Sequence, residues 1–406
     1  MERRKDRILL CLCHLSGNEQ KFVQEAFDTN WVVPLGPNVN GFEKDLEEFV
    51  GQNKRVVALS AGTAAVHLAL LNCGVDPGDE VCVQSFTFCA SSHPITYLGA
   101  TPVFIDSEKD TWNMDPELLE EAIKDRIAKT GKKPKAIVPV ALYGMPYKMD
   151  RIMEIANKYD IPVVEDAAEG FGSKYKGQVL GTFGKYGVLS FNGNKMITTS
   201  GGGALVTAND DEWREIMMYA TQYRESYPYY QHEKIGYNYR MSNICAGIGR
   251  GQMTIVNEHI AHHKKVQKLY EELLKDVKGI TVHSQPATGE YDSNYWLCTM
   301  TIDPDVKVKG QENSYKQVIT GAVGGAAGVI HAASSAVTDC QPNDNVEAMR
   351  MGLDALNIES RPLWKPMHKQ PVYKNAPAYV NGVSESLFKV GMCLPAGPYV
   401  TEDDVR

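Results

Sequence analysis

The stretch KAIVPVALYGMPYKMDRIMEIANKYDIPVVED, residues 135–166, sets out the architecture expected of this chain. It opens with an apolar strand at residue 135, continues through a helical segment from residue 149, and returns to a second apolar strand at 161–166. Strands that are apolar throughout belong in a sheet covered on both faces, and a helix between two strands lets them run parallel. The stretch therefore predicts an α/β fold.

The same alternation of strands and helices extends in both directions from this unit. The further elements that the pattern predicts are a helix at 62–73, strands near 81 and 102, a helix from Asp115 to about 128, a helical pattern over about 242–275, a strand at 295–302 and a helix near 344–357. Helices between apolar strands favour a mostly parallel central sheet with helices on both faces.

The elements group into three expected parts. We predict an N-terminal arm at 1–29, a large α/β domain at 30–260 and a smaller α+β domain at 261–406. Residues 318–338 are rich in Gly, Ala and Ser, which predicts a flexible or helical insertion.

Composition excludes several classes of function. The 406 residues carry a formal net charge of −8, so no global basic field would attract nucleic acid or an anionic membrane. No apolar stretch reaches the roughly 18 residues of a membrane span. Residues 1–15 resemble a signal peptide, but their apolar run is short and no cleavage site follows, so they are assigned to the arm.

The nine cysteines are scattered along the chain, as is typical of a reduced, cytoplasmic protein. Cys11, Cys13 and His14 could suggest a metal site. Because no second Cys/His cluster lies near them in the sequence, we predict no metal.

Ligands of open parallel sheets bind beyond the carboxyl ends of the strands, and three polar groups fall at such positions. Residues 60–63, SAGT, open a helix and could hold a phosphate. Asp166 ends a strand, and Lys195 follows SFNGN after another. Each of these features alone has an ordinary explanation. Residues 60–63 could cap a helix, and Asp166 and Lys195 could be solvated surface charges. The glycines at 201–203 are not a P-loop, and no G-x-G-x-x-G follows an early strand, which argues against a dinucleotide-binding fold.

Together these points resemble the fold-type I enzymes that use pyridoxal 5'-phosphate (PLP), and among them the sugar aminotransferases of the DegT/DnrJ/EryC1/StrS family. The similarity runs from about Asn30 to Gln252 and resumes near Val346 to Val405. The matching stretches are WVVPLGPNVNGFE, SAGTAAVHLAL, SFTFCASS, ALYGMPYKMD, EDAAEGFGSKYKGQVLGTFG, SFNGNKMITTSGGGALV, GYNYRMSN and ESRPLWKPMHKQP. Residues 303–342 match the family poorly, so nothing is carried over to them.

The resemblance implies a role for each matching residue of the cofactor site. Lys195 would bind PLP covalently and then shuttle a proton, and Asp166 would pair with the pyridine nitrogen. Phe88 would stack on the ring, whereas the neighbouring Phe86 would pack in the core. The remaining cofactor residues would be Gly62, Thr63 and Ser190 at the phosphate and Glu169 near the ring hydroxyl or the substrate.

The resemblance also implies partners and a reaction. Asn238 would reach the phosphate of a neighbouring subunit, which makes the protein a homodimer with shared active sites. Arg361, Lys365 and His368 could meet the diphosphate of a nucleotide sugar, although a solvated basic loop would look the same. The reaction would move the amino group of L-glutamate to a nucleotide-linked 4-keto-6-deoxy sugar.

The sequence leaves the exact function open. The EDAAEG and TTSGGG variants most resemble enzymes that act on UDP-4-keto-6-deoxy-N-acetylglucosamine. A 3-keto-sugar aminotransferase of the same family is an alternative, and so is a non-catalytic PLP-fold regulatory protein. The regulatory protein would be expected to lose Asp166 or Lys195, and both are present. Related dehydratases carry His where Lys195 stands, which makes that alternative weak.

Overall fold

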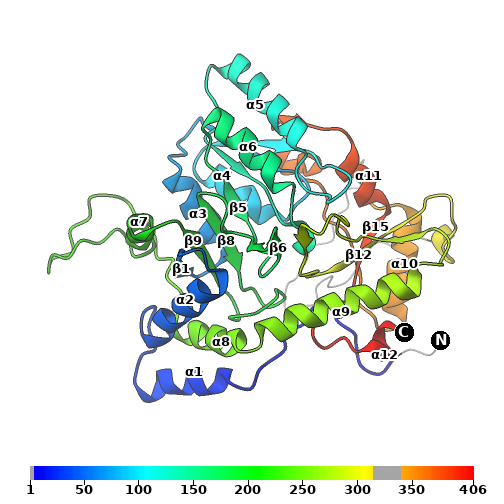
Figure 1. Ribbon diagram of the computed structural model, residues 1–406, viewed down its shortest axis with the longest axis horizontal. Helices are drawn as coiled ribbons and strands as arrows, with labels where there is room; N and C mark the ends of the chain where they lie inside the picture. Colours follow the sequence, from blue (N-terminus) through cyan, green and yellow to red (C-terminus); the bar gives the residue numbers. More distant parts are fainter. Residues whose placement is uncertain (1–3, 314–339) are drawn as a thin grey trace.

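The computed structural model describes residues 4–313 and 340–406. The insertion predicted at 318–338 lies outside the described residues. The molecule contains a large sheet and a smaller sheet in separate places, and helix α9 (Val256–Leu274) runs from the large sheet toward the smaller one (Figure 1). The mixed helix and strand content confirms the predicted α/β class.

The large sheet consists of two groups of strands that join edge to edge. Their order is β1 (Arg55–Leu59), β9 (Gly203–Thr207), β8 (Tyr186–Ser190) and β5 (Val164–Asp166), followed by β4 (Ala136–Val138), β2 (Glu80–Gln84), β3 (Thr101–Ile105) and β14 (Ala378–Tyr379). Parallel bridges from Ile137 to Val163 and from Val140 to Asp166 connect the two groups. The sheet is mostly parallel as predicted, because only β9 pairs antiparallel with its neighbours among these strands.

Helices cover both faces of the large sheet, which explains why its strands are apolar on both sides. The helices are α2 (Pro37–Val50), α5 (Pro116–Thr130) and α6 (Met149–Tyr159) on one face, and α3 (Gly62–Asn72), α4 (His93–Tyr97) and α7 (Asp210–Ala220) on the other. Strand β1 shows the alternation: Val56 and Ala58 enter the first core, whereas Val57 and Leu59 enter the second.

Local chemistry sets where several of the predicted elements begin or end. Helix α5 begins after Asp115, whose carboxylate accepts hydrogen bonds from two backbone N–H groups, as its sequence indicated. Strand β4 is shorter than the predicted one because Pro139 has no N–H to donate to the sheet. The strand predicted at 295–302 begins at Cys298, since Tyr295 has a left-handed φ of 49°.

The single long helix predicted over 242–275 is wrong in one respect: it is two helices. Helix α8 (Asn243–Met253) ends at Thr254, whose hydroxyl donates to the carbonyl of Gly251 at 2.6 Å. The β-branched run from Thr254 to Val256 disfavours helix continuation, and α9 begins only at Val256, the last residue of the run.

The smaller sheet is antiparallel and lies toward the C-terminal part of the chain. Its strands are β10 (Ile280–Val282), β12 (Cys298–Ile302), β15 (Gly391–Leu394) and β13 (Arg361–Pro362), and α9, α10 (Asp344–Ala355) and α11 (Val383–Val390) contact it. The predicted C-terminal domain is not confined to this sheet, because β14 adds to the edge of the large sheet. The remaining α-helices and strands are α1 (Glu19–Asp28), α12 (Glu402–Val405) and the small sheet of β6 (Lys174–Tyr175), β7 (Gln178–Val179) and β11 (Tyr291–Asp292).

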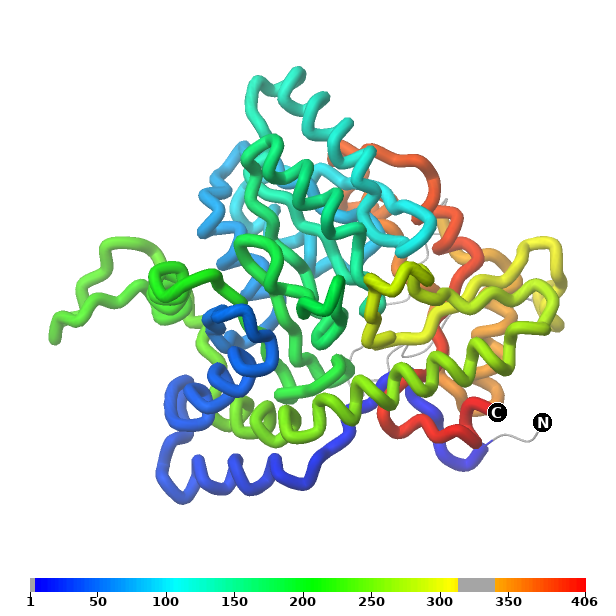
Figure 2. Tube along the Cα trace, in the orientation of Figure 1, coloured from blue at the N-terminus to red at the C-terminus, as the bar shows by residue number. Residues whose placement is uncertain are grey.

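One segment leaves the body of the molecule. The chain between α7 and α8 projects as an extended arm, the green segment that reaches farthest to the left in Figure 2. A backbone bridge between Thr221 and Asn238 closes its base, so the projecting arm spans 221–238. Within the described ranges, we find no helix with both the length and the apolar character needed to cross a bilayer.

Candidate active site

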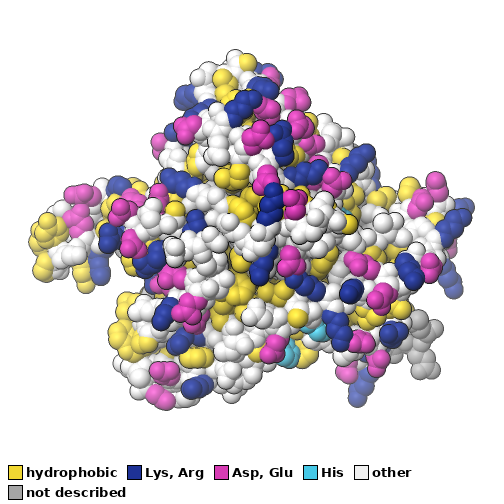
Figure 3. All heavy atoms as spheres, viewed as in Figure 1, with side chains coloured by type: hydrophobic (Ala, Val, Ile, Leu, Met, Phe, Trp, Pro, Cys, Tyr) yellow, Lys and Arg dark blue, Asp and Glu magenta, His cyan; other side chains and the backbone are white. Residues whose placement is uncertain are grey.

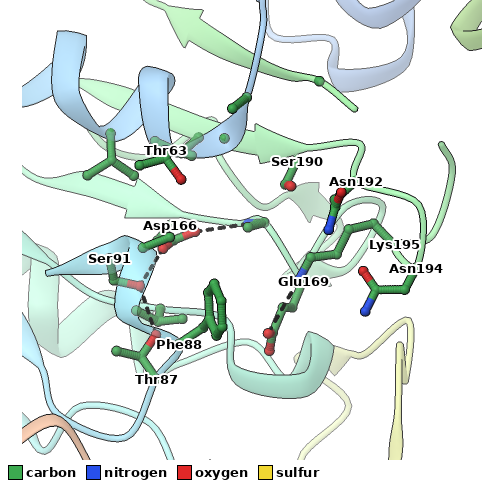
Figure 4. Close-up of a pocket in the computed structure, with 18 of the residues that line it drawn as sticks. Thr63, Thr87, Phe88, Ser91, Asp166, Glu169, Ser190, Asn192, Asn194 and Lys195 are labelled. Atoms are coloured by element: carbon green, nitrogen blue, oxygen red, sulfur yellow. Dashed lines mark hydrogen bonds and ion pairs between the residues drawn. The ribbon is translucent and has the colours of Figure 1, made fainter. Parts of the chain in front are cut away.

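A cavity of about 390 Å³ lies at the carboxyl ends of β5 and β8. The residues that line this cavity come from segments that are far apart in the sequence (Figure 4). The predicted site residues that line it are Gly62, Thr63, Phe88, Asp166, Glu169, Ser190 and Lys195. The parallel strands place Asp166 and Ser190 at the same edge of the sheet, where ligands of such sheets bind.

The N-terminus of α3 forms one end of the cavity. The first N–H groups of a helix have no intrahelical partner, and the residue before this helix, Ala61, offers no side chain to cap them. The hydroxyl groups of Thr63 and Ser190 lie beside this end. Backbone approaches closely here, because a Cβ on Gly203 would collide with the backbone nitrogen of Gly62. Free N–H groups, two hydroxyl groups and a helix dipole together form a site for a phosphate.

Asp166 forms another wall of the cavity and is 4% exposed. Its carboxylate accepts hydrogen bonds from Ser91 Oγ at 2.6 Å and from the backbone N–H of Ala168 at 3.1 Å. Burial raises the pKa of Asp166, whereas the Ser91 and Ala168 hydrogen bonds and the charge of Lys195 act in the opposite direction. A buried carboxylate of this kind is stabilised by a cationic N–H group.

Lys195 reaches into the cavity from the loop after β8. Its Nζ lies 3.4 Å from Oε1 of Glu169, and the other Glu169 oxygen accepts the backbone N–H of Tyr143 at 2.6 Å. Burial raises the pKa of Glu169, and the nearby Lys195 ammonium lowers it. The lysine is thus an internal amine held beside a buried acid, and not the solvated surface charge that it could have been.

The two aromatic residues of SFTF have different positions. Phe86 is fully buried in the core, whereas Phe88 is 48% exposed and lines the cavity. The ring of Phe88 lies 5.2 Å from that of Trp364, which lines the same cavity. The open face of Phe88 is therefore available to a flat ligand.

Four predicted residues do not line the cavity. Asn238 is exposed at the base of the projecting arm. Arg361 pairs with Glu359 at 2.9 Å, and Nδ1 of His368 lies 2.6 Å from Ser85 Oγ. Lys365 is likewise not among the residues around the cavity.

Sequence reasoning missed several polar and aromatic residues of the site. These are Thr87, Ser91, Asn192, Asn194 and Trp296. Thr87 and Ser91 stand inside the SFTFCASS stretch, so their spacing from Phe88 was the available signal. Trp296 had no such signal, because it comes from a turn before β12 that only the fold brings here.

The cavity fits PLP on three counts. The α3 N-terminus suits a phosphate, Asp166 suits a protonated ring nitrogen, and Lys195 supplies an amine for an aldehyde. Among the residues described, no group of three or more His, Cys, Asp and Glu side chains is arranged to hold a metal ion.

Comparisons with known proteins agree with this fit. Residues 14–323 match the family model described as the DegT/DnrJ/EryC1/StrS aminotransferase family. The chain is 42% identical over 402 residues to EpsN of Bacillus subtilis (strain 168), which is described as a pyridoxal phosphate-dependent aminotransferase, and the match covers 98% of this chain and 93% of that protein. It is 35% identical over 400 residues to GDP-perosamine synthase of Caulobacter vibrioides, with 98% and 95% covered.

A solved structure shows the same fold. The crystal structure of a DegT DnrJ EryC1 StrS aminotransferase from Brucella abortus superposes with a TM-score of 0.80 at 28% identity, covering 96% of this chain and 92% of that one. The cavity, the matched motifs and these relatives lead to one conclusion: the chain belongs to the DegT/DnrJ/EryC1/StrS aminotransferase family.

Proposed function

We propose that this PLP-dependent aminotransferase moves the amino group of L-glutamate to a nucleotide-linked 4-keto-6-deoxy sugar. The observation that carries the proposal is that Lys195, Asp166 and the N-terminus of α3 border one cavity. No two of these features are close in the sequence, and each suits a different part of the same cofactor.

PLP, when bound, supplies an electron sink that stabilises negative charge on the reacting carbon. Lys195 would hold the cofactor through Nζ. Once an amino donor displaces it, the same Nζ would carry a proton between the reacting carbon of the bound substrate and C4' of the cofactor. Glu169, 3.4 Å away, would keep the released ammonium at the reacting centre.

Asp166 would maintain a positive charge on the ring nitrogen. A carboxylate without a cationic partner is costly in a buried position, and burial already raises the pKa of Asp166. A ring N–H⁺ would relieve this cost, so pairing would stabilise both charges. Ser91 would fix the carboxylate in the orientation that faces the ring.

The acceptor is proposed to be a UDP-linked 2-acetamido-2,6-dideoxy-4-keto hexose. The EDAAEG and TTSGGG variants support this choice. The similarity to GDP-perosamine synthase supports a nucleotide-linked substrate, although with another nucleotide. Trp364 lines the cavity and stacks at an interplanar angle of 14° on Tyr143, so its outer face could cover a sugar or a base.

The working unit is proposed to be a homodimer with shared sites. Lys195 is the one Lys or Arg among the described residues that line the cavity, yet glutamate and a diphosphate both bring negative charge. The projecting arm exposes apolar residues, with Tyr229 71% and Ile235 86% exposed, and hydrophobic side chains gather at its tip (Figure 3). An arm of this kind, packed on a second copy, would bring Asn238 to the partner's phosphate site.

The substrates and thiols are consistent with a cytoplasmic enzyme. All nine cysteines are free, as expected in a reducing compartment.

Two experiments test the proposal. Borohydride reduction of the PLP-loaded protein, followed by peptide mapping, should label Lys195; a label on another lysine with Lys195 unmodified would contradict the site. The pyridoxamine form should then be offered UDP-, GDP- and dTDP-linked 4-keto and 3-keto sugars, with the return of the cofactor absorbance as the readout. We expect the UDP-N-acetyl 4-keto sugar to react fastest, and no turnover of any nucleotide sugar would overturn the function.

A further inference from the structure

Lys195 has a second partner besides Glu169, and it is an aromatic ring. The Nζ of Lys195 lies 3.9 Å from the centroid of the Trp296 ring. Trp296 is 2% exposed, so its ring cannot move freely. An ammonium over an indole face is attracted by the negative electrostatic potential of the ring, and more strongly when water is excluded.

Trp296 also fixes the loop that carries the lysine. Its indole Nε1 donates a hydrogen bond of 2.7 Å to the carbonyl oxygen of Asn194, the residue immediately before Lys195. One side chain therefore holds both ends of the lysine: the backbone through a hydrogen bond and the ammonium through the ring face.

The two partners of the ammonium share one support. The fully buried Asn294 accepts the backbone N–H of Trp296 at 2.8 Å through Oδ1. Its Nδ2 donates to the carbonyl oxygens of Glu169 and Phe171, both at 2.9 Å. The turn before β12 thus locks the position of Trp296 relative to Glu169.

We propose that Trp296 is a positioning residue that holds Lys195 at the reacting centre. Its ring would contact the Lys195 ammonium whenever the lysine is not bonded to the cofactor. The inference rests on the proposed role of Lys195. A lysine released from the cofactor in each half-reaction has four rotatable bonds. The ring and Glu169 limit the directions in which it can point, which keeps Nζ at a high effective concentration beside the cofactor carbonyl and the substrate carbon.

The test compares two ways of modifying Lys195 in the cofactor-free protein. Capture by PLP with cyanoborohydride needs the amine to be aimed at a bound aldehyde, whereas acetylation by acetic anhydride needs only access. Both are followed by mass spectrometry of the Lys195 peptide. Lys185, whose Nζ lies 5.4 Å from the centroid of the Tyr186 ring outside the cavity, serves as the internal reference.

The matched variants are Trp296→Phe and Trp296→Leu. Both lose the hydrogen bond to Asn194, so their difference isolates the ring face. We expect the leucine variant to slow PLP capture about tenfold and the phenylalanine variant no more than about threefold, because a benzene face retains part of the attraction. Acetylation should change by less than about twofold in either variant, since misdirection of the amine does not bury it.

Equal slowing of PLP capture in both variants, or no slowing in either, would overturn the positioning role. Parallel changes in acetylation would also overturn it, because they would reflect access. If the leucine variant does not fold, as judged by its melting temperature, Trp296→Met takes its place and likewise lacks a ring. A wild-type protein in which PLP labels another lysine would instead refute the proposed function, so the two failures are distinguishable.

Discussion

Ser91 Oγ donates a hydrogen bond of 2.6 Å to Oδ2 of Asp166, and Ser91 Oγ in turn lies 2.8 Å from Thr87 Oγ1. All three side chains are at most 4% exposed. The hydroxyl groups therefore form a short chain that ends on the carboxylate proposed to face the ring nitrogen, as Figure 4 shows. The chain fixes one carboxylate oxygen and leaves the orientation of Asp166 little freedom.

The Ser91→Ala substitution tests this orientation. Loss of a hydrogen bond to a charged group should weaken PLP binding about tenfold, measured by titrating the cofactor-free protein with PLP. Ser92→Ala is the matched control, because the Ser92 hydroxyl bonds the carbonyl of Cys89 and not Asp166. Equal affinities in the two variants would show that Ser91 does not support the cofactor.

Asp166→Asn should have opposite effects on activity and on stability. Turnover should fall by orders of magnitude, because an amide cannot compensate a positive ring nitrogen. The cofactor-free protein should become more stable at pH 8 by about 1–2 kcal/mol, because the substitution removes a buried charge. The measurements are single-turnover kinetics and the free energy of unfolding in urea.

The sign of the pH dependence follows from the raised pKa of Asp166. A group with a raised folded pKa stabilises the fold while protonated, and this stability is lost as the pH rises through that pKa. The advantage of Asp166→Asn should therefore shrink from pH 8 toward pH 4. Glu19→Gln is the control: the carboxylate of Glu19 accepts the backbone N–H groups of Ser16 and Gly17 and an N–H of the Gln252 amide. Burial acts to raise the pKa of Glu19, but these hydrogen bonds outweigh burial and lower it, so its replacement should destabilise the protein at pH 8. An Asp166→Asn protein that is less stable at both pH values would contradict the argument.

Gly203→Ala should damage the phosphate site through the backbone. The added methyl group would collide with the backbone of Ala61 and Gly62, which begins α3. We expect a loss of about 1–3 kcal/mol in stability, as is usual for overpacking, and weaker binding of PLP. Gly201→Ala is the control, since a Cβ there meets no atom within 4 Å. Unchanged PLP affinity in the Gly203 variant would argue against a phosphate at this end of the cavity.

Shared active sites can be tested by mixing inactive variants. If Asn238 acts across a dimer interface, Lys195→Ala and Asn238→Ala subunits should form hybrids with one intact site, and random exchange should restore about a quarter of wild-type activity. Lys195→Ala mixed with Asp166→Asn is the control and should stay inactive, because both residues line the cavity of one chain. A fully active monomer in sedimentation would refute the shared site.

Arg361→Ala tests the acceptor side. Arg361 lies outside the cavity and pairs with Glu359, but it belongs to the same short segment as Trp364, which lines the cavity. Removing a charge that contacts a diphosphate should slow the sugar half-reaction about tenfold or more and leave the glutamate half-reaction within about twofold. Equal losses in both half-reactions would show that Arg361 supports the fold instead.

Much of the fold could be predicted from local sequence. Helix α6 follows from its apolar periodicity, α5 from its Asp115 cap, and α3 and the strands of the large sheet from their apolar runs, because burial leaves a strong pattern in the sequence. The single-helix prediction over 242–275 failed at Thr254, where side-chain chemistry outweighed the period. The antiparallel direction of β9 was not predictable, since strand direction depends on the connection and not on the strand's own residues.

The sequence by itself determined which residue types could do the chemistry: Lys195 after one strand, Asp166 at the end of another and a small-residue turn opening α3. The tertiary structure decided what surrounds them. Ser91, Glu169 and Trp296 reach the site from separate segments, and neither the 2.6 Å bond to Asp166 nor the ring under Lys195 has a local signal. Side-chain contacts across tens or hundreds of residues arise only when the strands are ordered and packed, so they belong to the fold and not to any one stretch of the chain.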